Sequence, residues 1–410
     1  MNSKYLIILI FITQSAISSF NSYRSADTST LQIDQAETVK VSLFELNPPG
    51  TIRVTADSSD VNIYSEEAEI NLSGLSLDLN LALSGGVMYL ETAGIRQPVD
   101  SLEIRSHSAP SRVITEEFGY RYYSGALLFK PNRTENGISA INTVDLEEYI
   151  ASVVGSEMNF EEPDALKAQA VVSRTYALWS IARSPYPGFD MRDYESNQMY
   201  VGQIQGKPHY AEAARATRGE ILTWSGQLIL AVYSSTCGGT TANNEEVWDG
   251  LPHPYLKSQQ DGVMCSASPH YEWSYSVSRA QLREIIRKQY GFSFVDHEFE
   301  RTASGRINRI LLKDRAGEVI QFTGNEFRLF LNDIFGPRAV RSTNFEWEEV
   351  AGTITFSGRG LGHGVGMCQW GAKGFAETGW SYKDILSFYF SGTKIVNLDS
   401  IQSNQLPLYP

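Results

Sequence analysis

The chain has 410 residues, enough for two or three domains that each bury a core of their own. Hydrophobic residues make up 42% and charged residues 20%, as in an ordinary globular protein, so disorder is not the default. The net charge of −13 argues against nucleic acid and anionic membrane surfaces as partners, and any acidic ligand would need a local cationic patch.

The N-terminal sequence predicts an exported protein of the periplasm or cell envelope. Residues 1–20 hold one lysine, a short apolar run and then small residues, which is typical of a signal peptide. The alternative is an uncleaved anchor, the only way in which we expect this chain to contact a membrane. Residues 21–37 are rich in Ser, Thr, Asp and Gln without periodicity and predict a linker.

The remaining chain predicts an α+β protein. Residues 38–135 hold short alternating segments separated by Gly, Pro, Asn and Asp, which predict a β-rich N-terminal domain. After it the pattern changes to mixed helices and strands. Helices are predicted at 145–158, 163–183, 278–291, 325–336 and 382–390, and strands at 219–224, 227–235, 307–314, 318–324 and 353–358.

The three cysteines allow two interpretations. Export would place them in an oxidising compartment, where Cys237 and Cys265 can close a modest loop as a disulfide and Cys368 is left over. A metal site is the alternative, because His253 and His270 interleave with these cysteines. Their spacing matches no compact zinc pattern, so we predict a disulfide, no metal and no cofactor.

Charged side chains on apolar helix faces are the candidates for chemistry. Glu157 projects near the middle of an apolar stripe on the first helix, where a raised carboxyl pKa would suit a general acid. The alternative is that Gly155 breaks this helix and turns Glu157 out to solvent. Lys167 and Arg174 share one face of the second helix and suggest a cleft wall facing an anionic ligand, unless their long stems simply extend to the surface.

A glycine stretch, GRGLGHGVG from Gly358 to Gly366, lacks the G-x-G-x-x-G spacing of dinucleotide sites. If it is extended, its even positions present bare backbone that a ligand can approach, and His363 points to the other face. The alternatives are close packing of this backbone against a neighbouring element and a core histidine with satisfied hydrogen bonds.

Five segments, in this order, resemble the SpoIID/LytB family of bacterial cell-wall proteins: DLEEYIASVVGSEM, ALKAQAVVSRTYAL, SNQMYVGQ, YSSTCGGTTANNEEVW and GLGHGVGMCQWGAKGFAETGWSYKDILSFYFSGT. The resemblance implies a SpoIID/LytB-like domain over residues 136–396, mixed α/β with a glycan-binding cleft, followed by a C-terminal tail at 397–410. Departures are Asn159, where relatives often have proline, and Cys368, where they often have serine. Residues 240–244 also lack the Cys and His through which some SpoIID proteins bind zinc.

The same resemblance implies a function. Family members bind peptidoglycan glycan strands, especially strands stripped of peptide, and the SpoIID members cleave them as lytic transglycosylases. It places Glu157 on the catalytic glutamate and assigns to the substrate groove Lys167, Arg174, Gln198, Tyr200, Ser234, Ser235, His363, Gln369 and Trp370. The LytB-like members are amidase enhancers, so the alternative is a non-catalytic glycan binder with an N-acetylmuramoyl-L-alanine amidase as partner. A third possibility is a β-rich adhesion module beside an inert family domain.

Overall fold

The computed structural model describes residues 30–33, 37–56, 61–65, 69–70, 77–92, 94–248 and 250–409. The predicted signal peptide and most of the predicted linker lie outside the described residues. The chain divides into two compact units, one running to Ala231 and resuming at Lys394, the other covering Val232–Thr393. Among the described helices, none has the length and apolar character needed to cross a membrane.

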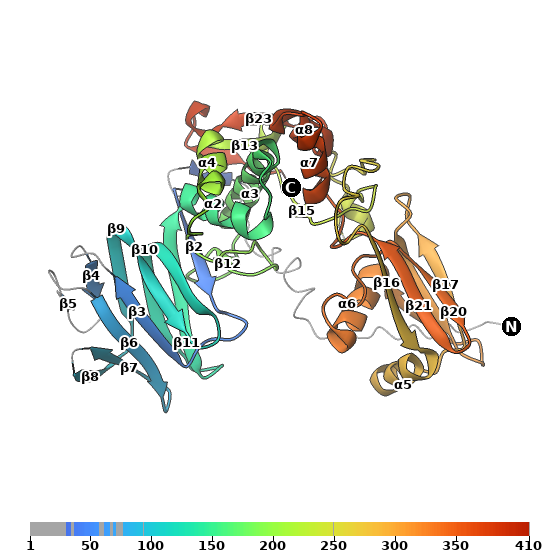
Figure 1. Ribbon diagram of the computed structural model, residues 1–410, viewed down its shortest axis with the longest axis horizontal. Helices are drawn as coiled ribbons and strands as arrows, with labels where there is room; N and C mark the ends of the chain where they lie inside the picture. The colour runs from blue at the N-terminus through green and yellow to red at the C-terminus, as the bar shows by residue number, and fades with distance from the viewer. Residues whose placement is uncertain are drawn as a thin grey trace. The chain divides into compact units, whose positions relative to one another are not determined.

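The first unit contains a large β-sheet (Figure 1). Its central path runs β12-β2-β11-β10-β9-β3-β6-β7-β8, while β4 pairs with β9 and β5. Every pairing is antiparallel except that of β12 with β2. The strands are β2 (Thr38–Leu43), β3 (Thr51–Ala56), β4 (Val61–Tyr64), β5 (Glu69–Ile70), β6 (Leu77–Ser84), β7 (Val87–Thr92), β8 (Ile95–Val99), β9 (Leu102–Thr115), β10 (Gly119–Asn132), β11 (Gly137–Asp145) and β12 (Met191–Arg192).

The alternation read from the sequence explains this sheet. In β3 every second residue is buried, and in β6 Leu77, Leu79 and Leu81 are buried, which is what a strand with one face on a core requires. The strand β11 is hydrogen-bonded between β2 and β10. The predicted boundary between residues 135 and 136 therefore runs through the sheet, and the position of the domain boundary stays a prediction.

Three helices follow: α2 (Leu146–Glu157), α3 (Pro163–Ala182) and α4 (Pro208–Ala216). Asp145 caps α2 by accepting hydrogen bonds from the N–H groups of Glu147 and Glu148 at 2.8 and 3.2 Å. Pro163 occupies the first turn of α3, where its missing N–H costs nothing. These local signals explain why both predicted helices form within a residue or two of their expected bounds.

Small sheets complete the first unit. One has the order β14-β13-β23, formed by β13 (Glu220–Trp224), β14 (Gln227–Leu228) and β23 (Lys394–Asn397). In another, β1 (Thr30–Gln32) pairs with β24 (Gln405–Pro407). The described strand β1 thus falls within the predicted linker, and β24 falls within the predicted C-terminal tail. The tail also contains the short 3₁₀ helix Leu398–Ser400.

The second unit combines helices with three small sheets. The segment expected as one strand at 227–235 is interrupted: β14 ends at Leu228 and β15 begins at Tyr233. The strands are β15 (Tyr233–Ser234) with β22 (Met367–Cys368), β16 (Glu272–Ser278) with β21 (Thr353–Arg359) and β20 (Phe345–Val350), and β17 (Asp296–Arg301) with β18 (Ile307–Lys313) and β19 (Val319–Thr323). The helices are α5 (Arg279–Tyr290), α6 (Gly324–Phe335), α7 (Gln369–Glu377) and α8 (Tyr382–Tyr389), with a 3₁₀ turn at Asn244–Glu246.

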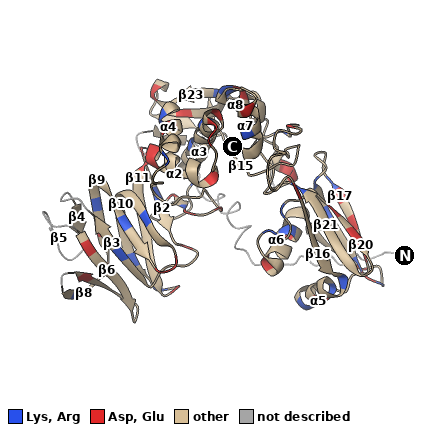
Figure 2. Cartoon of the chain, viewed as in Figure 1, with Lys and Arg blue, Asp and Glu red and all other residues tan. Residues whose placement is uncertain are grey.

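Aromatic packing holds the part of this unit that contains α5 and α6, which flank the strands in Figure 1. The rings of Trp347 and Phe356 pack edge to face with 5.1 Å between their centroids. The ring of Phe327, in α6, stacks on Trp347 with 5.9 Å between the centroids. Residues of both charge signs occur in each unit (Figure 2). The mixed α+β class is confirmed.

Candidate functional site

Glu157 is the last residue of α2. The helix continues through Gly155, so the alternative that Gly155 breaks it is wrong. A Cβ atom at Gly155 would lie 2.4 Å from the ring of Tyr210, so glycine at this position allows α2 and α4 to pack closely. The Glu157 side chain is partly exposed, and its Oε1 atom accepts a 2.9 Å hydrogen bond from the N–H of Met199. Glu157 is therefore an oriented carboxyl group at a helix end within reach of solvent.

The segment around Met199, which binds Glu157, is itself held in place by its two buried neighbours, Gln198 and Tyr200. Gln198 is fully buried and accepts a hydrogen bond from the hydroxyl of Tyr149 at 3.1 Å. Tyr200 is 1% exposed and donates its hydroxyl proton to Asn142 at 2.6 Å. We expected both side chains to contact a ligand. The structure instead buries them, and they place the Met199 backbone against Glu157.

The two cations of α3 have different environments. Lys167 is partly exposed and lies 3.8 Å from Asp164. The Arg174 side chain is 0% exposed, and its Nε and Nη2 atoms donate to the Glu147 carboxylate at 2.8 and 2.5 Å. It also donates to the carbonyl groups of Glu220 and Ala214. This corrects the expectation that Arg174 faces an anionic ligand, because Glu147 already neutralises it inside the fold.

The glycine stretch belongs to the second unit and is not an extended strand. The strand β21 ends at Arg359, and beyond it Gly360, Gly362, Gly364 and Gly366 all have φ between +72° and +100°. A Cβ atom at Gly366 would lie 2.1 Å from the carbonyl oxygen of Val232. The bare backbone is therefore used for close packing within the protein, which was the alternative to approach by a ligand.

His363 is held at both ring nitrogens. Its Nε2 atom lies 2.8 Å from the carbonyl oxygen of Tyr233, and the N–H of Val365 donates to Nδ1 at 3.1 Å. A carbonyl oxygen can only accept, so Nε2 carries the proton and the ring is neutral. Desolvation lowers the pKa of His363 to about 4, which keeps it in this form at neutral pH. The geometry favours a histidine that fixes its neighbours over one whose nitrogens contact a substrate.

The remaining predicted groove residues surround the β15–β22 pair. The carbonyl oxygen of Ser235 accepts a hydrogen bond from the N–H of Trp370 at 3.1 Å, and both residues are partly exposed. Ser234 and Gln369 are 6% and 5% exposed. Of these four residues, Ser235 and Trp370 have the accessibility that a ligand contact requires.

The cysteines do not form the predicted disulfide in this structure. The Sγ atoms of Cys237 and Cys265 lie 3.6 Å apart, well beyond the length of an S–S bond of about 2.05 Å. Cys368 and Asp261 join them in one buried group. Hydrogen bonds from Cys237 and Cys368 lower the pKa of Cys265, whereas burial raises the pKa of Asp261 to about 6. Asp261 was not among the residues predicted from the sequence, although it lies only four positions before Cys265.

His253 and His270, the histidines considered for a metal site, do not join this group. His253 stacks on Tyr255 with 5.3 Å between the ring centroids. The Nδ1 atom of His270 lies 3.1 Å from the Arg341 guanidinium. The interleaving of histidines and cysteines along the sequence therefore does not correspond to a spatial cluster.

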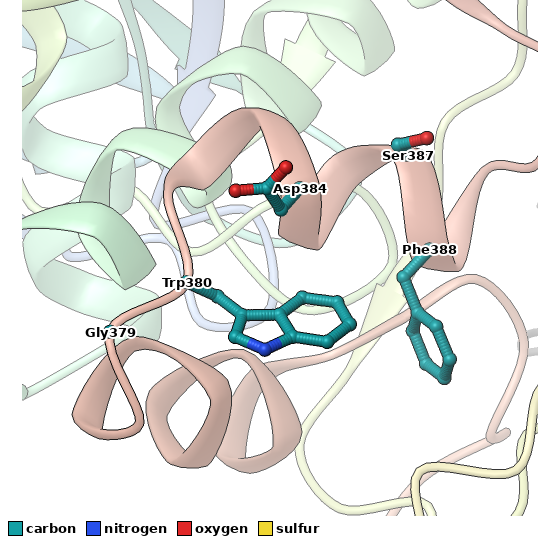
Figure 3. A pocket seen from close by; sticks show the side chains of 5 residues that line it. All are labelled: Gly379, Trp380, Asp384, Ser387 and Phe388. Carbon is teal, nitrogen blue, oxygen red and sulfur yellow. The ribbon is translucent and has the colours of Figure 1, made fainter.

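Glu157 lines none of three pockets found among the described residues, one in the first unit and two in the second. The first unit has a pocket of about 600 Å³ between α2 and α4, with charged lining residues that include Glu147, Glu148, Lys207, Arg215 and Arg218. The second has one of about 440 Å³ lined by Gly379, Trp380, Asp384, Ser387 and Phe388 (Figure 3). There Trp380 is 37% exposed, and its ring stacks on that of Phe375 with 4.3 Å between the ring centroids. Trp380, an aromatic residue beside a turn glycine, was also not among the residues predicted from the sequence.

Comparisons with known proteins identify the family. The family described as SpoIID, Stage II sporulation protein, matches residues 134–224. Stage II sporulation protein D of Bacillus amyloliquefaciens is 32% identical over 290 residues, which cover 67% of this chain and 80% of that protein. The chain belongs to the SpoIID family.

The SpoIID match covers only part of the predicted groove. It contains Glu157 and Lys167, together with the buried Arg174, Gln198 and Tyr200. A second match, to a domain of unknown function named DUF8618, covers residues 263–366 and includes His363. Ser234, Ser235, Gln369 and Trp370 lie outside both matches. The assignment of these four residues to a groove stays a prediction, as do the roles of Glu157 and Lys167.

Two further relatives extend the likeness beyond the SpoIID match. An uncharacterized protein of Brachyspira hyodysenteriae is 32% identical over 380 residues, which cover 90% of this chain and 95% of that protein. The amidase enhancer of Bacillus subtilis is 27% identical over 367 residues, which cover 78% of this chain and 50% of that protein. This SpoIID-family chain is therefore similar to a protein named as an enhancer as well as to proteins named for sporulation.

Proposed function

We propose that this exported SpoIID-family protein binds peptidoglycan glycan strands, preferably strands stripped of peptide, and cleaves them as a lytic transglycosylase. The observation that carries the proposal is the position of Glu157. It sits at the end of α2, partly exposed, with one carboxylate oxygen held by the N–H of Met199. A general acid and base needs this combination of fixed orientation and access to substrate.

One carboxyl group is sufficient for this reaction. Most glycosidases use two carboxyl groups, because one protonates the leaving oxygen while the other assists water or attacks the sugar. In a transglycosylase, Glu157 protonates the glycosidic oxygen as the bond to muramyl C1 breaks. The resulting carboxylate then accepts the proton of the 6-hydroxyl of the same muramic acid, whose oxygen attacks C1. The product is a 1,6-anhydro-muramyl end, and no water is consumed.

Lys167 supplies the local positive charge that an acidic protein needs for an anionic strand. Each muramic acid without a peptide carries a free lactyl carboxylate, which a partly exposed ammonium group can bind. Arg174 is left out of the proposed groove because Glu147 already binds it. Ser235 and Trp370 are the accessible candidates in the second unit, and their contact with a glycan strand is part of the proposal.

The test is mass spectrometry of soluble fragments after incubation with peptide-free glycan strands. Wild type is compared with Glu157→Gln and with Glu212→Gln, which removes an exposed carboxylate from α4. We expect 1,6-anhydro-muramyl products from wild type and Glu212→Gln, and a rate lower by about 10² to 10⁴ for Glu157→Gln. Equal rates for all three proteins would exclude Glu157 as the acid and base.

The second candidate function is that of a non-catalytic amidase enhancer, which the likeness to the Bacillus subtilis protein favours. It predicts that wild type and Glu157→Gln both sediment with the strands and that neither releases fragments. The same proteins would then be added to an N-acetylmuramoyl-L-alanine amidase and the release of stem peptides measured. A faster release that does not depend on Glu157, without any glycan cleavage, would support the enhancer.

A further inference from the structure

Four potential metal-ligating side chains converge in the core of the second unit. Cys237 follows β15, Asp261 and Cys265 lie in the loop before β16, and Cys368 ends β22 at the start of α7. The three cysteines are 0% exposed and Asp261 is 4% exposed. One ligand atom from each residue can be chosen so that all four lie within 4.8 Å of one another. Nothing in the chemistry proposed for Glu157 uses this group.

The spacing of the sulfur atoms fits a shared metal better than a disulfide. A tetrahedral ion with Zn–S bonds of about 2.3 Å holds its sulfur ligands about 3.8 Å apart. The Sγ atoms of Cys237 and Cys265 are 3.6 Å apart. A disulfide between Cys237 and Cys265 would also leave the Cys368 thiol and the Asp261 carboxyl group buried beside it, without an interaction as strong as a bond to a metal ion.

Hydrogen-bond donors surround the group in the way that anionic ligands require. The N–H of Cys237 and the N–H of Gly371 each donate to the Cys368 sulfur at 3.2 Å, and the N–H of Gly239 donates to the Cys237 sulfur at 3.2 Å. The hydroxyl of Tyr389 donates to Asp261 Oδ2 at 2.9 Å. Hydrogen bonds to metal ligands, from groups that do not bind the metal themselves, orient these ligands and stabilise their deprotonated forms.

A buried cation beside the group provides an independent observation. Arg306 is 1% exposed, and its Nη2 atom donates to the carbonyl oxygen of Cys237 at 2.7 Å. Its Nε and Nη1 atoms are buried and have no hydrogen-bond partner among the described residues. A buried guanidinium is costly without negative charge nearby. Three thiolates and a carboxylate around a divalent ion carry a net charge of about −2, which would compensate Arg306.

We propose that Cys237, Asp261, Cys265 and Cys368 bind one Zn²⁺ ion in a closed tetrahedral site. Thiolate ligands select zinc over magnesium and calcium, which prefer oxygen. Four protein ligands leave no position for a substrate, so the role is structural. The ion would join β15, the loop before β16 and the start of α7, and thereby fix the contact between Ser235 and Trp370. This replaces the expectation of a disulfide and no metal.

The test measures metal and thiols in the purified full-length protein and does not depend on any glycan activity. Zinc is determined by elemental analysis, and the cysteines are alkylated under denaturing conditions with a chelator and counted by mass spectrometry. We expect about one zinc per chain and three free thiols. After zinc removal, added Co²⁺ should give the intense visible absorption of a tetrahedral cobalt thiolate.

Variants assign the site. Cys368→Ser and Asp261→Asn should weaken zinc binding at least about tenfold, while Asp333→Asn, which changes an exposed carboxylate of α6, should not. If the variants fail to fold, the wild-type thiol count and cobalt spectrum still decide. A Cys237–Cys265 disulfide without zinc would overturn the proposal. So would three free thiols that bind neither Zn²⁺ nor Co²⁺, or zinc binding that is unchanged in Cys368→Ser and Asp261→Asn.

Discussion

Arg174 and Glu147 form an ion pair between α3 and α2 that is joined by two hydrogen bonds and is largely buried. The guanidinium is fully enclosed, and the two hydrogen bonds to the carboxylate measure 2.8 and 2.5 Å. The sequence places Arg174 on an apolar face where a ligand-binding cation would also be expected. A stabilising role and a ligand-binding role predict different results on substitution.

We expect Arg174→Met to lower the free energy of unfolding by about 3–5 kcal/mol, because it leaves the Glu147 carboxylate, which is only 14% exposed, without its cation. The double variant with Glu147→Gln should recover part of this loss. The control is Arg53→Met, which breaks the exposed pair with Asp78 and should cost at most about 1 kcal/mol. Denaturant unfolding measures all of these. Unchanged stability together with weaker glycan binding would show instead that Arg174 contacts the glycan.

His363 should make stability depend on pH between about 4 and 6.5. Its pKa is about 4 in the folded protein, against about 6.5 in an unfolded chain, so the unfolded state binds the proton first as the pH falls. The contribution of His363 to the free energy of unfolding, up to about 3 kcal/mol, is complete above about pH 6.5. It is lost progressively as the pH falls to about 4.

The measurement is the unfolding free energy of wild type and His363→Gln at several pH values in this range. The variant should show a shallower dependence, because it has no imidazole to protonate. His107→Gln, which changes an exposed histidine, should retain the wild-type dependence. If all three proteins gave the same slope, the neutral His363 between Tyr233 and Val365 would not be the group that titrates.

Gly366→Ala should destabilise the protein more than Gly352→Ala. Both glycines have a left-handed φ, +72° and +80°, which costs alanine about 1–2 kcal/mol. A Cβ atom at Gly366 would also collide with the Val232 carbonyl oxygen, whereas Gly352 has open space around it. Comparison of the two denaturation midpoints isolates the effect of close packing. Equal midpoints would contradict the packing of the glycine stretch described above.

Tyr200→Phe should lower stability by about 1–3 kcal/mol, because the buried Asn142 oxygen loses its donor. Binding to glycan strands should be unchanged. Tyr120→Phe is the control, since that side chain is 58% exposed and a surface substitution usually has little effect. Stability is measured by denaturant unfolding and binding by sedimentation. A loss of glycan affinity at wild-type stability would show that Tyr200 meets the ligand after all.

The sequence by itself determined the family and five of the described helices (α2, α3, α5, α6 and α8), whereas α4 and α7 were not predicted from it. The bounds of α2 and α3 follow from Asp145 as a cap, Pro163 in a first turn and an apolar repeat between them. These signals act over a few residues, so they can be recognised in the sequence without knowledge of distant contacts. The motifs were sufficient to identify the family for a similar reason, because their residues and their order along the chain do not depend on tertiary contacts.

Only the tertiary structure decided what the charged and polar side chains do. Whether Arg174 meets solvent depends on Glu147 and on the carbonyl groups of Glu220 and Ala214, which come from other segments. Asp261 and Cys368 lie in one cluster although more than a hundred positions of sequence separate them, and no local sequence pattern predicts such a contact. Helical period specifies which face a residue occupies, whereas folding over long distances specifies what that face encounters.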